Sequence, residues 1–252
     1  MADAMKRTVL RIGGTDRESF LQGLVTNDVG RLSDGPVYAA LLTPQGKYLC
    51  DFFLLADGDT ILLDAPAGRA ADLMKRLSMY KLRADVTIEE TDLHVAQGTG
   101  PTPAGAVVDP RDPALGWRAY GTDEGGIAPE DWTALRVERG VPEADIELVP
   151  GETLILEAGF ERLNGVDFRK GCFVGQEVVA RMKHKTELQK GIVRVAVEGT
   201  APMGTPIEAD GKTVGTLYSQ SGGAGLAHLR FRRAAEEMTA AGAVVRLEAS
   251  PA

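Results

Sequence analysis

The sequence lacks the cysteines and histidines from which a single chain usually builds a metal site. Its 252 residues include two cysteines, Cys50 and Cys172, and three histidines, with no Cys-x-x-Cys or His-x-x-x-His spacing. A secreted disulfide framework normally has more cysteines in a shorter chain. A zinc site or a four-thiolate iron–sulfur site needs ligands that this chain does not have. We therefore predict no metal site, and expect any iron–sulfur chemistry to involve a partner protein.

Excess positive charge and long hydrophobic runs are also missing. The formal net charge is -8 and the pI is about 5.0, which argues against direct binding to nucleic acid. No apolar run approaches the ~18–20 residues that cross a bilayer, and the first residues show no signal-peptide core. We expect a soluble, cytoplasmic, monomeric protein that does not bind membranes.

One short segment combines a thiol, two glycines, a cation, an amide and a carboxylate, and it reads Lys170-Gly171-Cys172-Phe173-Val174-Gly175-Gln176-Glu177. Apolar residues at four-residue spacing predict a helix from about 174 to 182. Cys172 would lie at the start of that helix, where free N–H groups, Arg169 and Lys170 favour a thiolate. The sequence therefore indicates an activated thiol at Cys172, with an inert buried cysteine as the alternative.

The rest of the chain mixes strands and helices without a regular βαβ repeat. Strands are predicted at 37–43, 48–55, 60–64, 86–88 and 93–95, a loop at 98–113, and helices at 15–26, 68–82 and 131–139. Thr15 and Glu18 have the spacing of a capping box. This pattern favours an α+β fold with an antiparallel sheet.

After residue 186, short strand candidates alternate with glycine turns. They lie at 192–197, 214–218, 226–229 and 244–247, and the charged segment 230–238 reads as a helical insertion. We predict a first portion at 1–186 and a small C-terminal β-barrel at 187–252.

Two polar pairs outside the central segment have alternative explanations. Asn27-Asp28 follows the first predicted helix, and a turn that ends the helix explains it without any function. Arg136 and Glu138 lie near the end of the helix at 131–139, where an acidic residue opposes the helix dipole. Glu138 is therefore either a binding residue or a solvated surface acid. The basic run from Arg181 to Lys190 is either a binding patch or a solvated face.

Three segments together resemble the YgfZ/IBA57 family of folate-binding proteins, within the superfamily of the glycine-cleavage T-protein, an aminomethyltransferase. They are residues 14–29, residues 42–47, and residues 170–177 with Arg181. The resemblance runs from about residue 10 to 230. It implies a folate-binding α+β portion of two interleaved subdomains around a central cavity, and a C-terminal β-barrel. It also implies a role in assembling or maintaining iron–sulfur clusters, with indirect effects on tRNA modification.

By this resemblance the ligand is tetrahydrofolate or a one-carbon-substituted folate, and the partners are iron–sulfur assembly proteins or cluster enzymes. Glu138 is the candidate for the pterin, with Asn27 and Asp28 near the folate and Arg136 or Arg181 at its anionic tail. The motif residues complete the expected binding set: Gly171, Gly175, Gln176 and Glu177. The expected catalytic residues are Cys172, Lys170 and Asp51.

The segment Cys50-Asp51 departs from the pattern of the aminomethyltransferases, which resemble this chain but carry paired aspartates there. Because aminomethyl transfer would use a carboxylate to position or protonate the adduct, this loss makes a transferase the alternative function, not the first. A third possibility is a folate-sensing scaffold in which residues 170–177 only shape a loop. A Cys172 thiol that titrates like a free cysteine would favour the scaffold.

Overall fold

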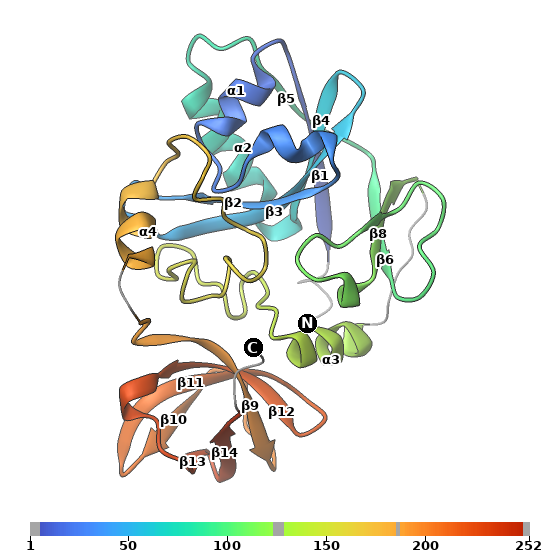
Figure 1. Cartoon of the computed structure of the whole chain (residues 1–252). Coiled ribbons are helices and arrows are strands. Elements are labelled where there is room, and N and C mark those ends of the chain that lie inside the picture. Colours follow the sequence, from blue (N-terminus) through green and yellow to red (C-terminus); the bar gives the residue numbers. More distant parts are fainter. Residues whose placement is uncertain (1–5, 123–128, 185–186, 249–252) are drawn as a thin grey trace.

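The computed structural model describes residues 6–122, 129–184 and 187–248. The chain forms a five-stranded sheet, a three-stranded sheet and a closed barrel (Figure 1). All pairs between named strands are antiparallel. This confirms the predicted α+β class with antiparallel sheets and a C-terminal barrel. The division of the chain after residue 186 stays a prediction.

The five-stranded sheet has the strand order β2-β3-β4-β1-β5 and contains the predicted meander. The turn before β3 uses Gly46 at φ 73°, and the turn before β4 uses Gly58 at φ 56°, a conformation that glycine adopts without steric cost. The strands are β1 (Arg7–Gly13), β2 (Val37–Leu42), β3 (Tyr48–Asp57), β4 (Thr60–Pro66) and β5 (Thr87–Glu90).

Helices α1 (Arg17–Gln22) and α2 (Ala67–Lys81) share one hydrophobic core with this sheet, through Leu21 and Leu73. The predicted capping box is wrong. The N-cap of α1 is Asp16, and no side chain caps it. Thr15 instead donates its hydroxyl to the Asp85 carboxylate at 2.9 Å, a partner 70 residues away.

The three-stranded sheet has the order β6-β8-β7, formed by β6 (His94–Gly98), β7 (Val107–Val108) and β8 (Trp117–Gly121). Strand β7 lies within the segment 98–113 that was expected to be loop, and a 3-10 turn, η3 (Pro113–Leu115), follows it.

A buried ionic cluster joins this small sheet to the large one. The Asp64 carboxylate accepts hydrogen bonds from Arg7 at 2.6 Å, Arg118 at 2.6 Å and the Tyr120 hydroxyl at 2.9 Å. Burial alone would raise the pKa of Asp64, but Arg118 and Arg7 outweigh burial and hold this pKa below its ordinary value. The cluster therefore fixes the position of β8 against β4.

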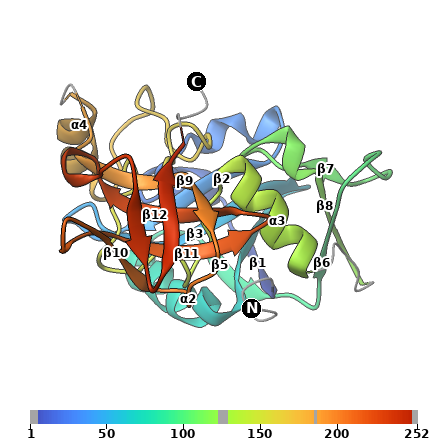
Figure 2. The same cartoon turned by 90° about the horizontal axis from the view of Figure 1, so that it is seen from below.

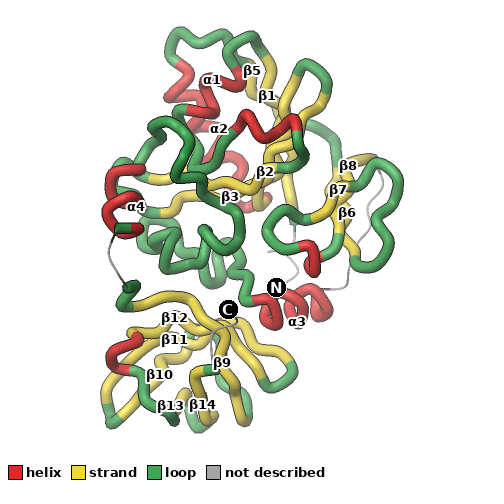
Figure 3. Tube along the Cα trace, viewed as in Figure 1, coloured by secondary structure: helices red, strands yellow, loops and turns green. Residues whose placement is uncertain are grey.

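Helix α3 (Pro129–Arg139) begins two residues before the predicted Asp131. Figure 3 shows that most of the chain between α3 and the next helix is loop. This irregular segment is nevertheless core, because its side chains Leu148, Ile155, Phe160 and Leu163 are buried. Helix α4 (Gln176–Lys183) then confirms the helix predicted from about 174 to 182, shifted by one or two residues.

The barrel has the closed strand order β10-β11-β12-β9-β14-β13. Figure 2 shows α3 alongside it, and Val137 of α3 packs with Ala224 and Leu226. The predicted helical insertion at 230–238 is only one 3-10 turn, η4 (Phe231–Arg233), before the chain returns to the barrel. The strands are β9 (Lys190–Glu198), β10 (Thr205–Ala209), β11 (Lys212–Ser221), β12 (Ala224–Arg230), β13 (Met238–Ala240) and β14 (Ala243–Leu247).

Candidate functional site

Lys170 holds the cysteine loop to the body of the protein. Its ammonium donates to the backbone carbonyls of Gln22 at 2.8 Å, Val25 at 2.6 Å and Asn27 at 2.9 Å, and it lies 5.3 Å from the centroid of the Phe173 ring. Burial lowers the pKa of Lys170 to about 8, and the nearby acidic residues Asp28 and Asp167 oppose that shift. All three ammonium donors are occupied, so Lys170 acts here as a structural anchor, and its predicted catalytic role lacks support in this geometry.

Gly175 allows two of the predicted motifs to touch. It has φ 84°, and a Cβ at this position would lie 2.6 Å from the carbonyl oxygen of Thr43. A Cβ on Gly46, in the same β2–β3 turn, would lie 2.8 Å from the Val178 Cβ. These two glycines therefore pack segment 42–47 against the start of α4. Gly171 has no such constraint, because nothing lies within 4 Å of its added Cβ.

Cys172 and the preceding Gly171 are exposed, whereas Lys170 and Phe173, which flank this pair, are buried. Cys172 lies three residues before Gly175, the N-cap of α4, and so outside the first turn where a helix dipole acts strongly. Among the described residues, no side chain forms a hydrogen bond with its sulfur. The loop therefore presents a thiol to the surroundings and supplies no general base to it.

The remaining motif residues lie on or near the surface. Gln176 is half-buried at the first position of α4. Glu177 and Arg181 form an i,i+4 ion pair at 3.8 Å, with both side chains more than two-thirds exposed. Such a pair contributes at most a few tenths of a kcal/mol in water, roughly 0.3–0.5. Arg181 is thus accessible to a ligand, and Lys183 beside it pairs with Glu161.

Asp51 lies in the interior of the sheet. Its two carboxylate oxygens accept the hydroxyls of Tyr38 at 3.0 Å and Tyr48 at 2.6 Å. Burial, then the negative charge of Asp51, raise the pKa of both tyrosines well above the ordinary value. Cys50 beside it is also buried, which raises the pKa of its thiol. Cys50 is therefore the inert thiol of the two.

A cavity of about 310 Å³ lies beside this group, between β2 and the small sheet. Asn27, Tyr38, Asp109 and Asn164 are among the residues that line it, and the first three are almost fully buried. The Asn27 amide donates to the carbonyls of Tyr38 at 2.8 Å and Asn164 at 2.6 Å. The volume is sufficient for a pterin-sized ring.

Asn27 is thus placed at a cavity, and its neighbour Asp28 caps a 3-10 helix, η2 (Val29–Ser33), by accepting from the Gly30 N–H at 3.0 Å. The turn explanation of this pair is therefore supported for Asp28. It also holds for Asn27, whose amide oxygen accepts from the Asp28 N–H at 2.8 Å while its N–H groups bond the two carbonyls, although the residue borders the cavity.

Arg136 is not available to a ligand in this structure, which corrects its assignment to the folate tail. Its guanidinium is fully buried against the barrel, donating to Glu147 at 3.0 Å and also to Ser219. Glu138 lies on the exposed side of α3 and is not among the residues that line the 310 Å³ cavity. The expected folate residues are therefore dispersed over three parts of the molecule.

Sequence reasoning missed Asn164 and the pair Asp109 and Arg111. Asn164 has φ 54°, and the dipeptide Asn-Gly was a turn signal that could have singled it out. Arg111 donates to both oxygens of Asp109 and lies 4.9 Å from the centroid of the Phe53 ring. Both residues lie in the glycine- and proline-rich segment 98–113, which was predicted to be loop, so nothing in the sequence indicated a buried ion pair there.

Among the residues that the structure describes, no cluster of histidine, cysteine, aspartate or glutamate has the arrangement of a metal site. In the same residues, no helix has the length and apolar character to cross a membrane.

Comparisons with known proteins agree with this architecture. The family model "CAF17, C-terminal beta-barrel domain" matches residues 189–251. The mitochondrial iron–sulfur cluster assembly factors IBA57 of Mus musculus and Homo sapiens are each 32% identical to this chain. The matches cover 89% and 88% of this chain and 75% of each relative.

Among solved structures, the glycine cleavage system aminomethyltransferase T of Bartonella henselae superposes with a TM-score of 0.75. It is 14% identical and the match covers 96% of this chain and 83% of that one, which shows a shared fold. From its 32% identity to the assembly factors over nearly nine-tenths of its length, the chain belongs to the YgfZ/IBA57 family.

Proposed function

We propose that this protein binds tetrahydrofolate and assists the assembly or maintenance of iron–sulfur clusters, with Cys172 as its functional thiol. The relatives at 32% identity are iron–sulfur cluster assembly factors by name. Effects on tRNA modification would follow indirectly, through enzymes that need clusters. The expected cytoplasmic location belongs to the same proposal, although those relatives are mitochondrial.

The observation that carries the proposal is the placement of Cys172. Lys170 and Phe173 are buried on either side of it, and Gly175 fixes the chain that follows. Cys172 itself is exposed, and no side chain of the described residues bonds its sulfur. A single thiolate cannot hold an iron–sulfur cluster by itself, but it can meet a cluster or group held by a partner protein. An exposed thiol beside an anchored segment suits that contact.

The folate part of the proposal is supported by a direct link between the loop and the cavity. The Lys170 ammonium donates to the carbonyl of Asn27, and Asn27 is one of the residues that line the 310 Å³ cavity. A folate bound there would therefore contact the same segment that anchors the cysteine loop. When bound, tetrahydrofolate could carry a one-carbon unit. Among the residues that line the cavity, the exposed Asn164 would supply a polar contact to its pterin.

Replacing Cys172 by Ser tests the thiol. We expect the variant to fold, to keep its affinity for tetrahydrofolate, and to fail to restore the activity of cluster enzymes in a strain that lacks the protein. Cys50→Ala is the matched control, since it removes the buried thiol and should restore activity. Full restoration by Cys172→Ser would refute a functional thiol.

Filling the cavity tests the folate site. Val108 lines the cavity and is 44% exposed, so Val108→Trp should block the space without disturbing the core. We expect calorimetric titration to show at least tenfold weaker tetrahydrofolate binding. Met203→Trp, at an exposed position on the barrel, is the control. Unchanged tetrahydrofolate affinity in Val108→Trp would mean that folate binds elsewhere. The affinity of Glu138→Ala, measured in the same titration, tests the pterin contact that the family resemblance assigns to Glu138.

A folate-dependent aminomethyltransferase is the second candidate, because the chain shares its fold with an enzyme of that activity. Asp51 is the acid that such a reaction would use, and both its oxygens are bonded to tyrosine hydroxyls in the interior. Formation of 5,10-methylenetetrahydrofolate from an aminomethyl-lipoyl donor would favour this enzyme over the assembly factor. We expect none above the background rate.

A further inference from the structure

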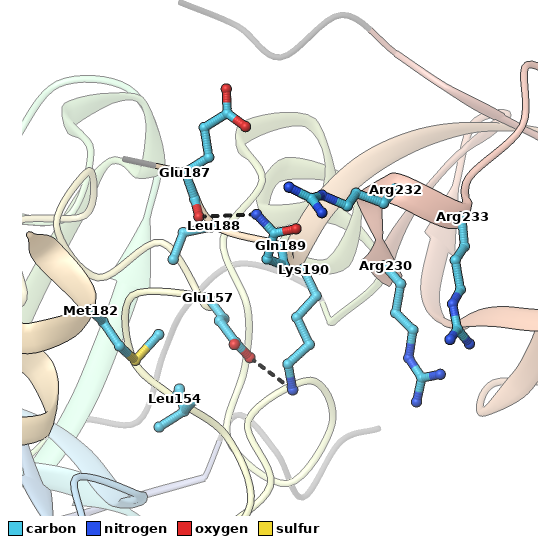
Figure 4. A pocket seen from close by; sticks show the side chains of 10 residues that line it. All are labelled: Leu154, Glu157, Met182, Glu187, Leu188, Gln189, Lys190, Arg230, Arg232 and Arg233. Carbon is cyan, nitrogen blue, oxygen red and sulfur yellow. Dashed lines mark hydrogen bonds and ion pairs between the residues drawn. The ribbon is translucent and has the colours of Figure 1, made fainter. Parts of the chain in front are cut away.

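A second cavity, of about 450 Å³, lies where the barrel meets the first portion of the chain (Figure 4). We call it the junction groove. Residues far apart in the sequence form it: the irregular core segment, the end of α4, the start of β9 and the turn η4. Its lining consists of Leu154, Glu157, Met182, Glu187, Leu188, Gln189, Lys190, Arg230, Arg232 and Arg233.

The groove contains a concentration of unneutralised positive charge. Arg230, Arg232 and Arg233 make no ion pair or side-chain hydrogen bond with any residue that the structure describes. The exposed Arg31 and Arg83 are likewise unpaired among the described residues, whereas Arg246 contacts two carboxylates, at 2.5 and 2.9 Å. The groove differs in that three unpaired arginines lie within four residues of the sequence and line one cavity. In a protein of net charge -8, three adjacent unpaired guanidiniums favour an anionic partner.

The floor of the groove is apolar. Leu154, Met182 and Leu188 line it, and Leu188 is 38% exposed. Figure 4 shows Arg232 extending toward Gln189, above these side chains. Arginine stems and methionine both adapt to apolar groups of varied shape. The groove thus offers apolar contact at its base and guanidinium donors at its edge.

Two acidic side chains limit which anion fits. Glu157 pairs with Lys190 at 3.3 Å, and Glu187 lies on the edge of the groove. A polyphosphate such as RNA would meet these carboxylates as well as the arginines, and it would leave the apolar floor uncovered. A peptide can instead place carboxylates at the arginines and apolar side chains on the floor.

We propose that the junction groove docks an acidic, leucine-rich segment of a partner protein. This inference rests on the proposed function in one respect, that the chain works with a partner. Met182 lies in the last turn of α4, and the eight residues of that helix span about 12 Å. A partner seated in the groove would therefore lie one short helix away from the loop that carries Cys172.

A labelled peptide, (Glu-Glu-Leu)5, tests the groove by fluorescence anisotropy. We expect micromolar binding to the full chain, weakened at least tenfold by the double variant Arg232→Glu/Arg233→Glu and weakened by salt. The control Arg11→Glu/Arg76→Glu changes the net charge equally at exposed positions outside the groove. It should bind the peptide with an affinity within twofold of the wild type.

Two further peptides separate charge from apolar contact. Both (Glu-Glu-Ser)5 and (Gln-Gln-Leu)5 should bind at least tenfold more weakly than (Glu-Glu-Leu)5. The first lacks the leucines that would contact the apolar floor, and the second lacks the carboxylates that would pair with the arginines. Any of three results overturns the proposal. They are no binding of (Glu-Glu-Leu)5, equal affinity for (Glu-Glu-Ser)5 and (Glu-Glu-Leu)5, and an equal loss of affinity in the two double variants. Displacement of the peptide by triglutamyl tetrahydrofolate or by poly(U) would assign the groove to a folate tail or to RNA and would also overturn it.

The outcome is independent of the test on Cys172. Cys172→Ser should bind the peptide with wild-type affinity, because the thiol is outside the groove. Loss of cluster-enzyme activity in Cys172→Ser without any peptide binding would overturn the docking site and leave the functional thiol intact.

Discussion

Lys170→Met tests whether the lysine of the motif is an anchor or a catalytic group. The substitution keeps the length of the side chain and removes the ammonium from three backbone carbonyls. Two of these bonds, to Val25 and Asn27, are buried. A buried acceptor without a partner costs about 1–3 kcal/mol, so the two cost roughly 2–6. Relief from burying a charge offsets part of this, and we expect a loss of about 2–4 kcal/mol in the free energy of unfolding.

Urea unfolding followed by circular dichroism measures this loss as a lower midpoint at unchanged slope. Arg169→Met is the control, because it also replaces a cationic side chain by methionine, one residue earlier, on a side chain that is 96% exposed. We expect the control to change stability by less than ~0.5 kcal/mol. Equal stability of the two variants would refute the anchor, and a stable but inactive Lys170→Met would return the lysine to a catalytic role.

The same lysine gives a dependence on pH. Its pKa is lowered to about 8 in the folded protein, from 10.5, chiefly by burial. Between these values the unfolded chain holds a proton that the folded chain has released, so this group makes folding more favourable as pH rises. The stability difference between wild type and Lys170→Met should therefore widen from pH 8 to pH 10. A difference that narrows over this range would contradict the lowered pKa.

Three further predictions concern the glycines, the ionic cluster and the thiols. Gly175→Ala should lower the free energy of unfolding, measured by urea unfolding, by about 1–3 kcal/mol, because its φ is positive and the new Cβ would meet a carbonyl. Gly171→Ala should leave this free energy unchanged. Asp64→Asn should cost about 3–5 kcal/mol by removing the buried negative charge that Arg7 and Arg118 share, and a cost below about 1 would refute a buried cluster. Iodoacetamide should label Cys172 alone in the native protein and Cys50 only in urea, as mass spectrometry would show.

The elements that sequence predicted well depend on neighbours along the chain. The β2–β3–β4 meander follows from two turns with glycine, and α4 follows from apolar residues four apart. Both signals act between residues that are close in sequence, so the structures they predict do not depend on contacts with distant segments. The capping box failed for the opposite reason. Its threonine found a better partner in Asp85, which the sequence places 70 residues away.

For the site, the sequence by itself determined that the segment 170–177 is chemically unusual and that Cys172 is its exceptional residue. Only the tertiary structure decided what each member does. The carbonyls that hold Lys170 come from 143 to 148 residues earlier, so its inward orientation leaves no trace in the local pattern. The same holds for Arg136, which the barrel buries. Side-chain chemistry is written in the sequence, but exposure and charge pairing arise only when distant segments pack together.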